Sequence, residues 1–83
     1  MLETLRSKPS DKRAVGAKQV GRALRNGEVL CVFLAEDADP KVTEPIEILC
    51  KNQSVSVEKV SSMSELGKAC GIAVGSSVAA IVE

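Results

Sequence analysis

The sequence predicts a three-layer α/β/α sandwich built on a small, mixed sheet of about four strands. Short apolar runs of strand length alternate along the chain with amphipathic stretches of helix length. The continuously apolar run 28–35 is typical of a central strand covered on both faces, which requires a layer of helices on each side of the sheet. The alternation of strands and helices indicates that the sheet is partly parallel.

The segment 16–27 carries the clearest helix signals in the chain. Val20, Ala23 and Leu24 recur at a spacing of three and four residues, which turns one stripe of the helix inward. Gly27, after Asn26, extends the stripe and supplies the left-handed stop that a helix C-terminus favours. We therefore expect a short amphipathic helix with a polar outer face.

Polar side chains gather at the start of this helix. Gly16 allows the backbone to come close to a partner, and Lys18 and Arg22, four residues apart, share a face beside Gln19. Because the free N–H groups of a helix N-terminus favour anions, this set suits an RNA or phosphate ligand. The alternative is an ordinary solvated face, since short helices with two basic residues are common.

The other elements follow from local signals. The expected elements are an N-terminal helix or arm within 1–11, a brief strand at 12–15, a helix from Pro45 to Asn52, a half-exposed strand at 54–58, a helix that follows a capping box at Ser62 and Glu65 and ends at Gly71, a loop at 72–77 and a buried strand at 78–82. All 83 residues are expected to form a single domain, because the chain is too short for a second core.

Charge is unevenly distributed although the net charge is zero. Residues 1–27 carry seven Lys or Arg against two acidic residues, whereas residues 28–83 carry four against nine. A basic front of this kind orients a protein towards RNA. Chance placement in a small protein is the alternative.

Several functional classes are not expected. The run 29–35 is too short to span a bilayer and 1–9 lacks the apolar core of a signal peptide, so we expect a cytoplasmic protein. Three cysteines and no histidine give no zinc site, and each cysteine has apolar neighbours that suit a small buried hydrophobe.

The acidic cluster Glu36, Asp37 and Asp39 raises a magnesium or phosphotransfer hypothesis. The chain offers no phosphate-binding loop, nucleophile or general base to accompany it. Acidic residues before a proline are also routine at helix entries. We therefore expect no catalytic residue, no metal and no cofactor.

Four segments in the same order resemble the kink-turn-binding ribosomal protein family, the L seven Ae family, and most of all its short bacterial members. They are Gly16-Ala17-Lys18-Gln19 with Ala23-Leu24 and Gly27, then 35–40, then Leu49-Cys50, and finally 66–71. The similarity covers residues 12–83 with matching gaps. It implies an RNA-binding protein, not an enzyme, that recognises the sharply bent internal loop called the kink-turn.

The resemblance also implies site residues. Gly16 and Ala17 match positions that approach the RNA backbone, Lys18 and Gln19 match the Asn-Glu pair that reads sheared G·A pairs in archaeal and eukaryotic members, and Arg22 matches a lysine beside them. Asp39 matches an acidic position near a flipped-out nucleotide, Ile72, Ala73 and Val74 match the loop that covers it, and Met63 stands where many relatives have a lysine.

Partners follow from the same resemblance. It implies structured RNA containing a kink-turn, in ribosomal RNA or an mRNA leader, with association with the ribosome, and nothing in the sequence suggests a dimer. The absence of Trp and Tyr excludes the aromatic platforms of sheet-based single-strand binders. The alternative function is a protein interaction module that uses the 72–74 loop as an apolar anchor.

Overall fold

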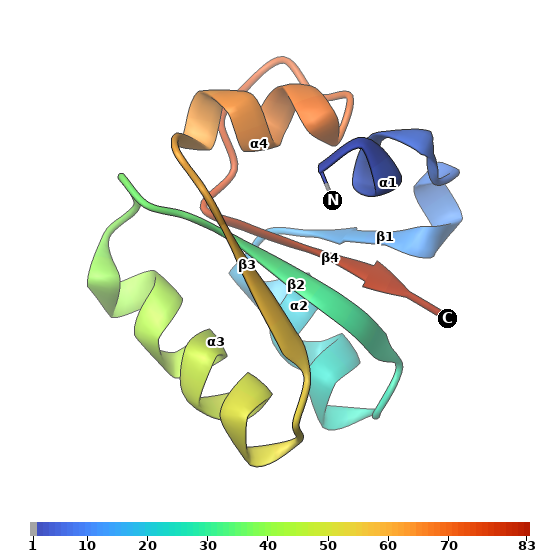
Figure 1. Cartoon of the computed structure of the whole chain (residues 1–83), viewed down its shortest axis with the longest axis vertical. Helices are drawn as coiled ribbons and strands as arrows, with labels where there is room; N and C mark the ends of the chain where they lie inside the picture. Colours follow the sequence, from blue (N-terminus) through green and yellow to red (C-terminus); the bar gives the residue numbers. More distant parts are fainter. Residues whose placement is uncertain (1) are drawn as a thin grey trace.

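The computed structural model describes residues 2–83, which form helices on both faces of a four-stranded sheet (Figure 1). In chain order the elements are α1 (Leu2–Ser7), the 3₁₀ helix η1 (Ser10–Lys12), β1 (Arg13–Val15), α2 (Ala17–Arg25), β2 (Val29–Ala35), α3 (Pro40–Asn52), β3 (Ser56–Val60), α4 (Met63–Ala69) and β4 (Val78–Val82). The single-domain boundary 1–83 stays a prediction.

The sheet is mixed and has the strand order β1-β4-β2-β3. β2 and β3 are parallel, whereas β4 is antiparallel to both β1 and β2. Helices α1 and α4 cover one face, and α2 and α3 cover the other (Figure 1). The predicted three-layer α/β/α sandwich with a mixed sheet is therefore confirmed.

Alternation along β2 explains why the core has two halves. Phe33 faces the cluster under α1 and α4, while Val32 and Leu34 face the cluster under α2 and α3, because successive strand residues point to opposite faces. Full coverage of this strand was an incorrect expectation for its first half. A β-bulge leaves Leu30 as an extra residue between the pairs of the ladder, and its side chain is 55% exposed.

Helix α2 occupies the expected segment, with Val20, Ala23 and Leu24 buried. Gly27 lies beyond its end, has φ 71° and is exposed, so it stops the helix without extending the apolar stripe. The backbone of Asn26 remains right-handed.

The prediction that a helix begins at Pro45 was wrong. Helix α3 begins five residues earlier, at Pro40, because the Asp39 carboxylate caps it by accepting a hydrogen bond from the Lys41 N–H at 2.9 Å. Pro40 takes the first helical position, which suits a residue without an N–H. Pro45 therefore lies inside the helix.

The strand expected at 54–58 begins two residues later, at Ser56. The turn that ends α3 occupies the intervening residues: the Val55 N–H donates to the Cys50 carbonyl at 2.9 Å, and Ser54 has φ 56°.

The capping box is half as expected. Ser62 Oγ accepts from the Glu65 N–H at 3.1 Å, but the Glu65 carboxylate accepts from the Ser61 hydroxyl at 2.6 Å instead of reaching back to the Ser62 N–H.

Every helix found within residues 2–83 is too short or too polar to cross a bilayer.

Candidate functional site

Three segments meet at one edge of the sheet: the start of α2, the end of β2 and the loop that leads into β4. The Gly16 N–H donates to the Val78 carbonyl at 2.9 Å, which joins the start of α2 to the start of β4. The Ala35 N–H donates to the Ser77 carbonyl at 3.0 Å, which joins the end of β2 to the same place. The start of α2 and the loop 71–77 that leads into β4 therefore lie on the same edge (Figure 1).

The start of α2 is accessible. Gly16 has φ 89° and ψ 154°, a conformation that side chains disfavour, and no heavy atom would lie within 4 Å of a Cβ built there. Lys18, Gln19 and Arg22 are exposed. Gln19 Oε1 accepts a hydrogen bond from the Val15 N–H at 3.1 Å, which leaves the amide NH₂ of Gln19 as its donor for a ligand.

The loop beside this helix presents apolar side chains to solvent. Val74 is 71% exposed, and Ile72 and Ala73 are exposed as well. The loop backbone lies directly against α4, because a side chain at the buried Gly67 would overlap the Val74 carbonyl oxygen. Gly67 also accepts a hydrogen bond from the Ile72 N–H at 3.1 Å, so α4 holds the loop in place.

Met63 anchors the neighbouring turns through its backbone. Its N–H donates to Asp37 Oδ1 at 2.7 Å, and its carbonyl accepts from the Ser76 N–H at 3.0 Å. The half-buried Met63 side chain packs against the core. Asp37 is therefore a positioning residue. The sequence suggested it only as a metal ligand, because no local signal pairs it with Met63, 26 positions away.

The acidic cluster is divided between two helices. The Asp37 carboxylate accepts a hydrogen bond from the first N–H of α4, whereas that of Asp39 caps α3. Within residues 2–83, no three His, Cys, Asp or Glu side chains lie close enough to hold a metal ion.

Two hollows flank α2 and separate its polar side chains. Lys18 lines a hollow towards α3, together with Arg25 and Lys41. Gln19 and Arg22 line a hollow towards β1, whose other wall carries carboxylates. Those carboxylates are Asp11, Glu28 and Glu83.

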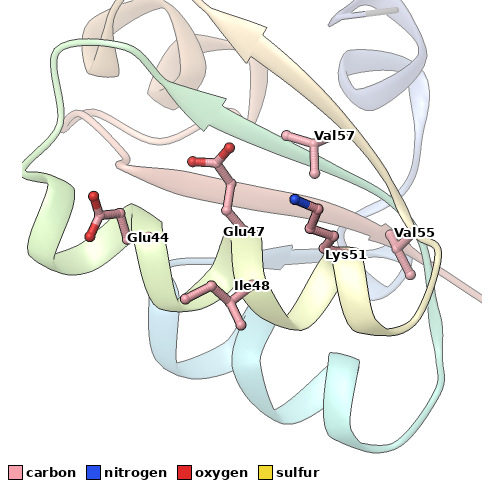
Figure 2. Close-up of a pocket in the computed structure, with 6 residues that line it drawn as sticks. All are labelled: Glu44, Glu47, Ile48, Lys51, Val55 and Val57. Carbon is pink, nitrogen blue, oxygen red and sulfur yellow. The ribbon is translucent and has the colours of Figure 1, made fainter.

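A third hollow lies between α3 and β3 (Figure 2). Its rim carries Glu44, Glu47 and Lys51, around the side chains of Ile48, Val55 and Val57. Both carboxylates project from α3 on the side away from α2.

The three cysteines are free thiols. Burial raises the pKa of each, and the nearby Glu58 carboxylate raises the pKa of Cys31 further. A raised pKa disfavours the nucleophilic thiolate, which agrees with the interpretation of these residues as small hydrophobes.

The fold and site together define a class of small α/β/α proteins in which the basic start of a helix lies beside an exposed apolar loop. A family model described as "Ribosomal protein L7Ae/L30e/S12e/Gadd45 family" matches residues 1–83. The chain belongs to this family, as the resemblance predicted.

Similar proteins agree with this assignment. "RNA-binding protein GWCH70_0105" of Geobacillus sp. (strain WCH70) is 48% identical over 71 residues, which are 86% of this chain and 87% of that protein. "RNA-binding protein YbxF" of Geobacillus stearothermophilus is 45% identical over the same shares of the two chains. The solved structure "Giardia lamblia 15.5kD RNA binding protein" has a TM-score of 0.86 at 25% identity, and covers 99% of this chain and 68% of its own.

Proposed function

We propose that this protein binds RNA and recognises kink-turns with sheared G·A pairs, stabilising the bent form of the RNA. The observation that supports the proposal is the Gly16–Val78 hydrogen bond, which joins the start of α2 to the start of β4, the strand that the loop 71–77 leads into. Family membership and the names of the relatives support RNA as the ligand. Those names describe binding proteins and not enzymes.

The start of α2 offers the chemistry for base edges and phosphates. The Lys18 ammonium donates to guanine O6 and N7, and Arg22 donates in the same way from the next turn. Gln19 contributes its amide NH₂, because its oxygen is already bonded to the Val15 N–H. Gly16 and Ala17 let the RNA backbone approach, since open space lies next to Gly16.

The 72–74 loop supplies the second part of the proposed RNA-binding surface. A nucleotide that is flipped out of the bend packs against the exposed Ile72 and Val74 side chains and leaves water. Met63 and Asp39 contribute by position, because one anchors the loop and the other caps α3 next to the same edge.

Binding shifts the RNA from an extended to a kinked population. Phosphates crowd together in the bend, and the cations of α2 relieve their repulsion while releasing counterions. The proposal includes a monomeric protein that acts in the cytoplasm, on ribosomal RNA or an mRNA leader. Association with the ribosome follows if the target is ribosomal RNA.

A gel shift with a kink-turn RNA tests the proposal. We expect binding that weakens as salt rises and that is lost when the sheared G·A pairs are replaced by Watson–Crick pairs. A fluorescence pair on the two stems should report bending only with the intact motif. Equal affinity for both RNAs would leave nonspecific attraction alone, and would favour the interaction module, for which the exposure of Val74 is the supporting observation.

A further inference from the structure

Helices α2 and α3 border an open hollow of about 400 Å³ that begins at the proposed RNA-binding edge. Three cations line it: Lys18 and Arg25 from α2, and Lys41 from α3. No carboxylate lines it: Glu44 and Glu47 of α3 line the hollow on the other side of the helix, and the Asp39 carboxylate caps the start of α3. The floor is apolar.

The position of Arg25 shows how the cations gather. A Cβ built on Gly21 would lie 3.6 Å from Arg25 Nη1, so the guanidinium lies back over Gly21 towards the start of α2. The same Cβ would lie 3.8 Å from Ile46 Cδ1, so the missing side chain lets α3 approach closely. Lys18 is three positions before Gly21 on the same helix surface.

We propose that this α2–α3 groove binds the phosphate backbone of the RNA stem that continues from the kink. The inference rests on the proposed function and extends its footprint beyond the bent motif. Guanidinium and ammonium groups without a competing carboxylate suit phosphates, and Arg25 offers the planar fork that binds them bidentately. The apolar floor has no side-chain donors for base edges, so the contact is independent of sequence.

We infer RNA as the occupant because the groove is continuous with the start of α2, here called the tip (residues 16–19). Lys18 belongs both to the tip and to the groove, and Arg25 lies seven residues further on, roughly 10 Å along the helix axis. A backbone that leaves the start of α2 along the helix therefore meets Lys41, in the first turn of α3, and then Arg25, at the end of α2. It stays clear of the carboxylates in the hollow towards β1.

Three kink-turn RNAs test the groove: one with minimal stems, and two in which one or the other stem is extended. In Arg25→Ala/Lys41→Ala protein we expect the affinity gained by one extension to fall roughly tenfold, and the salt dependence for that RNA to weaken by about one unit of log–log slope per lost phosphate contact. Affinity for the minimal RNA should stay that of the wild type.

Lys51→Ala is the matched control, because it removes a lysine from the same helix on the side that faces β3. This variant should bind the minimal and the extended RNAs with wild-type affinity. Lys41→Glu is a second variant that keeps the helix stable, since an acidic residue is favourable in the first turn, and it should weaken binding of the extended RNA more than Lys41→Ala does.

The outcomes separate the two proposals. If wild-type protein ignores the G·A pairs, the proposed function itself fails. If it requires them but the double variant binds the extended RNAs as wild type does, or loses equal affinity for minimal and extended RNAs, the groove is overturned and kink-turn recognition stands.

Discussion

The two hollows on either side of α3 share one helix wall but differ in charge. Towards α2, the groove carries three cations and no carboxylate. Towards β3, the rim carries Glu44, Glu47 and Lys51 (Figure 2). Lys59 Nζ lies 3.5 Å from Glu47 Oε2. The side chain of Lys41 and that of Glu44, only three positions apart, line different hollows.

The face of a helix, and not the region of the sequence, therefore decides where a polyanion can lie. The chain is neutral overall, and Lys41 belongs to its acidic part, 28–83. Folding nevertheless places Lys41 beside the basic residues of α2. A local field of one sign attracts a charged ligand even when the net charge is zero.

The largest effect should come from the outer face of α2. Gln19→Ala/Arg22→Ala is expected to cost about 1–3 kcal/mol of RNA binding for each lost base contact. Lys51→Ala/Gln53→Ala, which likewise removes one cation and one amide but from the end of α3, serves as the control and should bind normally. Equal losses in the two variants, measured by gel shift, would show that RNA does not distinguish the outer face of α2 from the end of α3.

Two buried helix glycines give the next test. Gly67→Ala should destabilise the fold by about 1–3 kcal/mol in urea denaturation, because the new methyl group overlaps the Val74 carbonyl and displaces the loop. Gly21→Ala meets only ordinary contacts at 3.6 Å or more, and should be neutral or slightly stabilising. The reverse order of stabilities would show that the loop is not held by α4.

Asp37→Ala should have a smaller effect. It removes the hydrogen bond to the Met63 N–H, which is worth about 1 kcal/mol net, and loosens the turn next to the 72–74 loop. Thermal unfolding should show the loss, whereas Glu36→Ala at the exposed neighbour should leave the midpoint unchanged. Identical midpoints for the two variants would remove Asp37 from the positioning role.

The smallest effect is expected in the hollow towards β3. Glu47→Gln breaks the ion pair with Lys59, which is largely exposed to solvent and so should contribute less than about 1 kcal/mol to stability. The difference from wild type should shrink further in high salt, and RNA affinity should not change. A marked loss of RNA binding would place RNA on this side of α3 as well.

The parts of the fold that depend on local patterns were predictable from the sequence. The spacing of Val20 and Leu24 placed α2, and Ser62 marked the start of α4. Pro45 misled because two prolines compete for the first helical position, and the carboxylate of Asp39 decides for Pro40. The start of β3 shifted because the turn at Ser54 is set by the end of α3, which depends on contacts outside that segment.

The candidate site was predictable only in part for the same reason. Helical spacing exposed Lys18 and Arg22, and the resemblance pointed to the 72–74 loop. The link between Asp37 and Met63, the fit of the loop on Gly67 and the gathering of Lys41 with Arg25 join residues far apart in sequence. Gly67, which lies inside an expected helix, was the one local signal. It indicated that another segment approaches closely, but not which segment.

The interior place of β4 has a consequence for biosynthesis. β1 is paired with β4 and with no other described strand, although more than sixty positions separate the two in sequence. On a translating ribosome, the Gly16 N–H can bond to the Val78 carbonyl only after Val78 has emerged. The two parts of the proposed RNA-binding surface cannot be joined before then. Nascent chains therefore acquire this edge last, so a partly synthesised copy should not compete with finished molecules for their target.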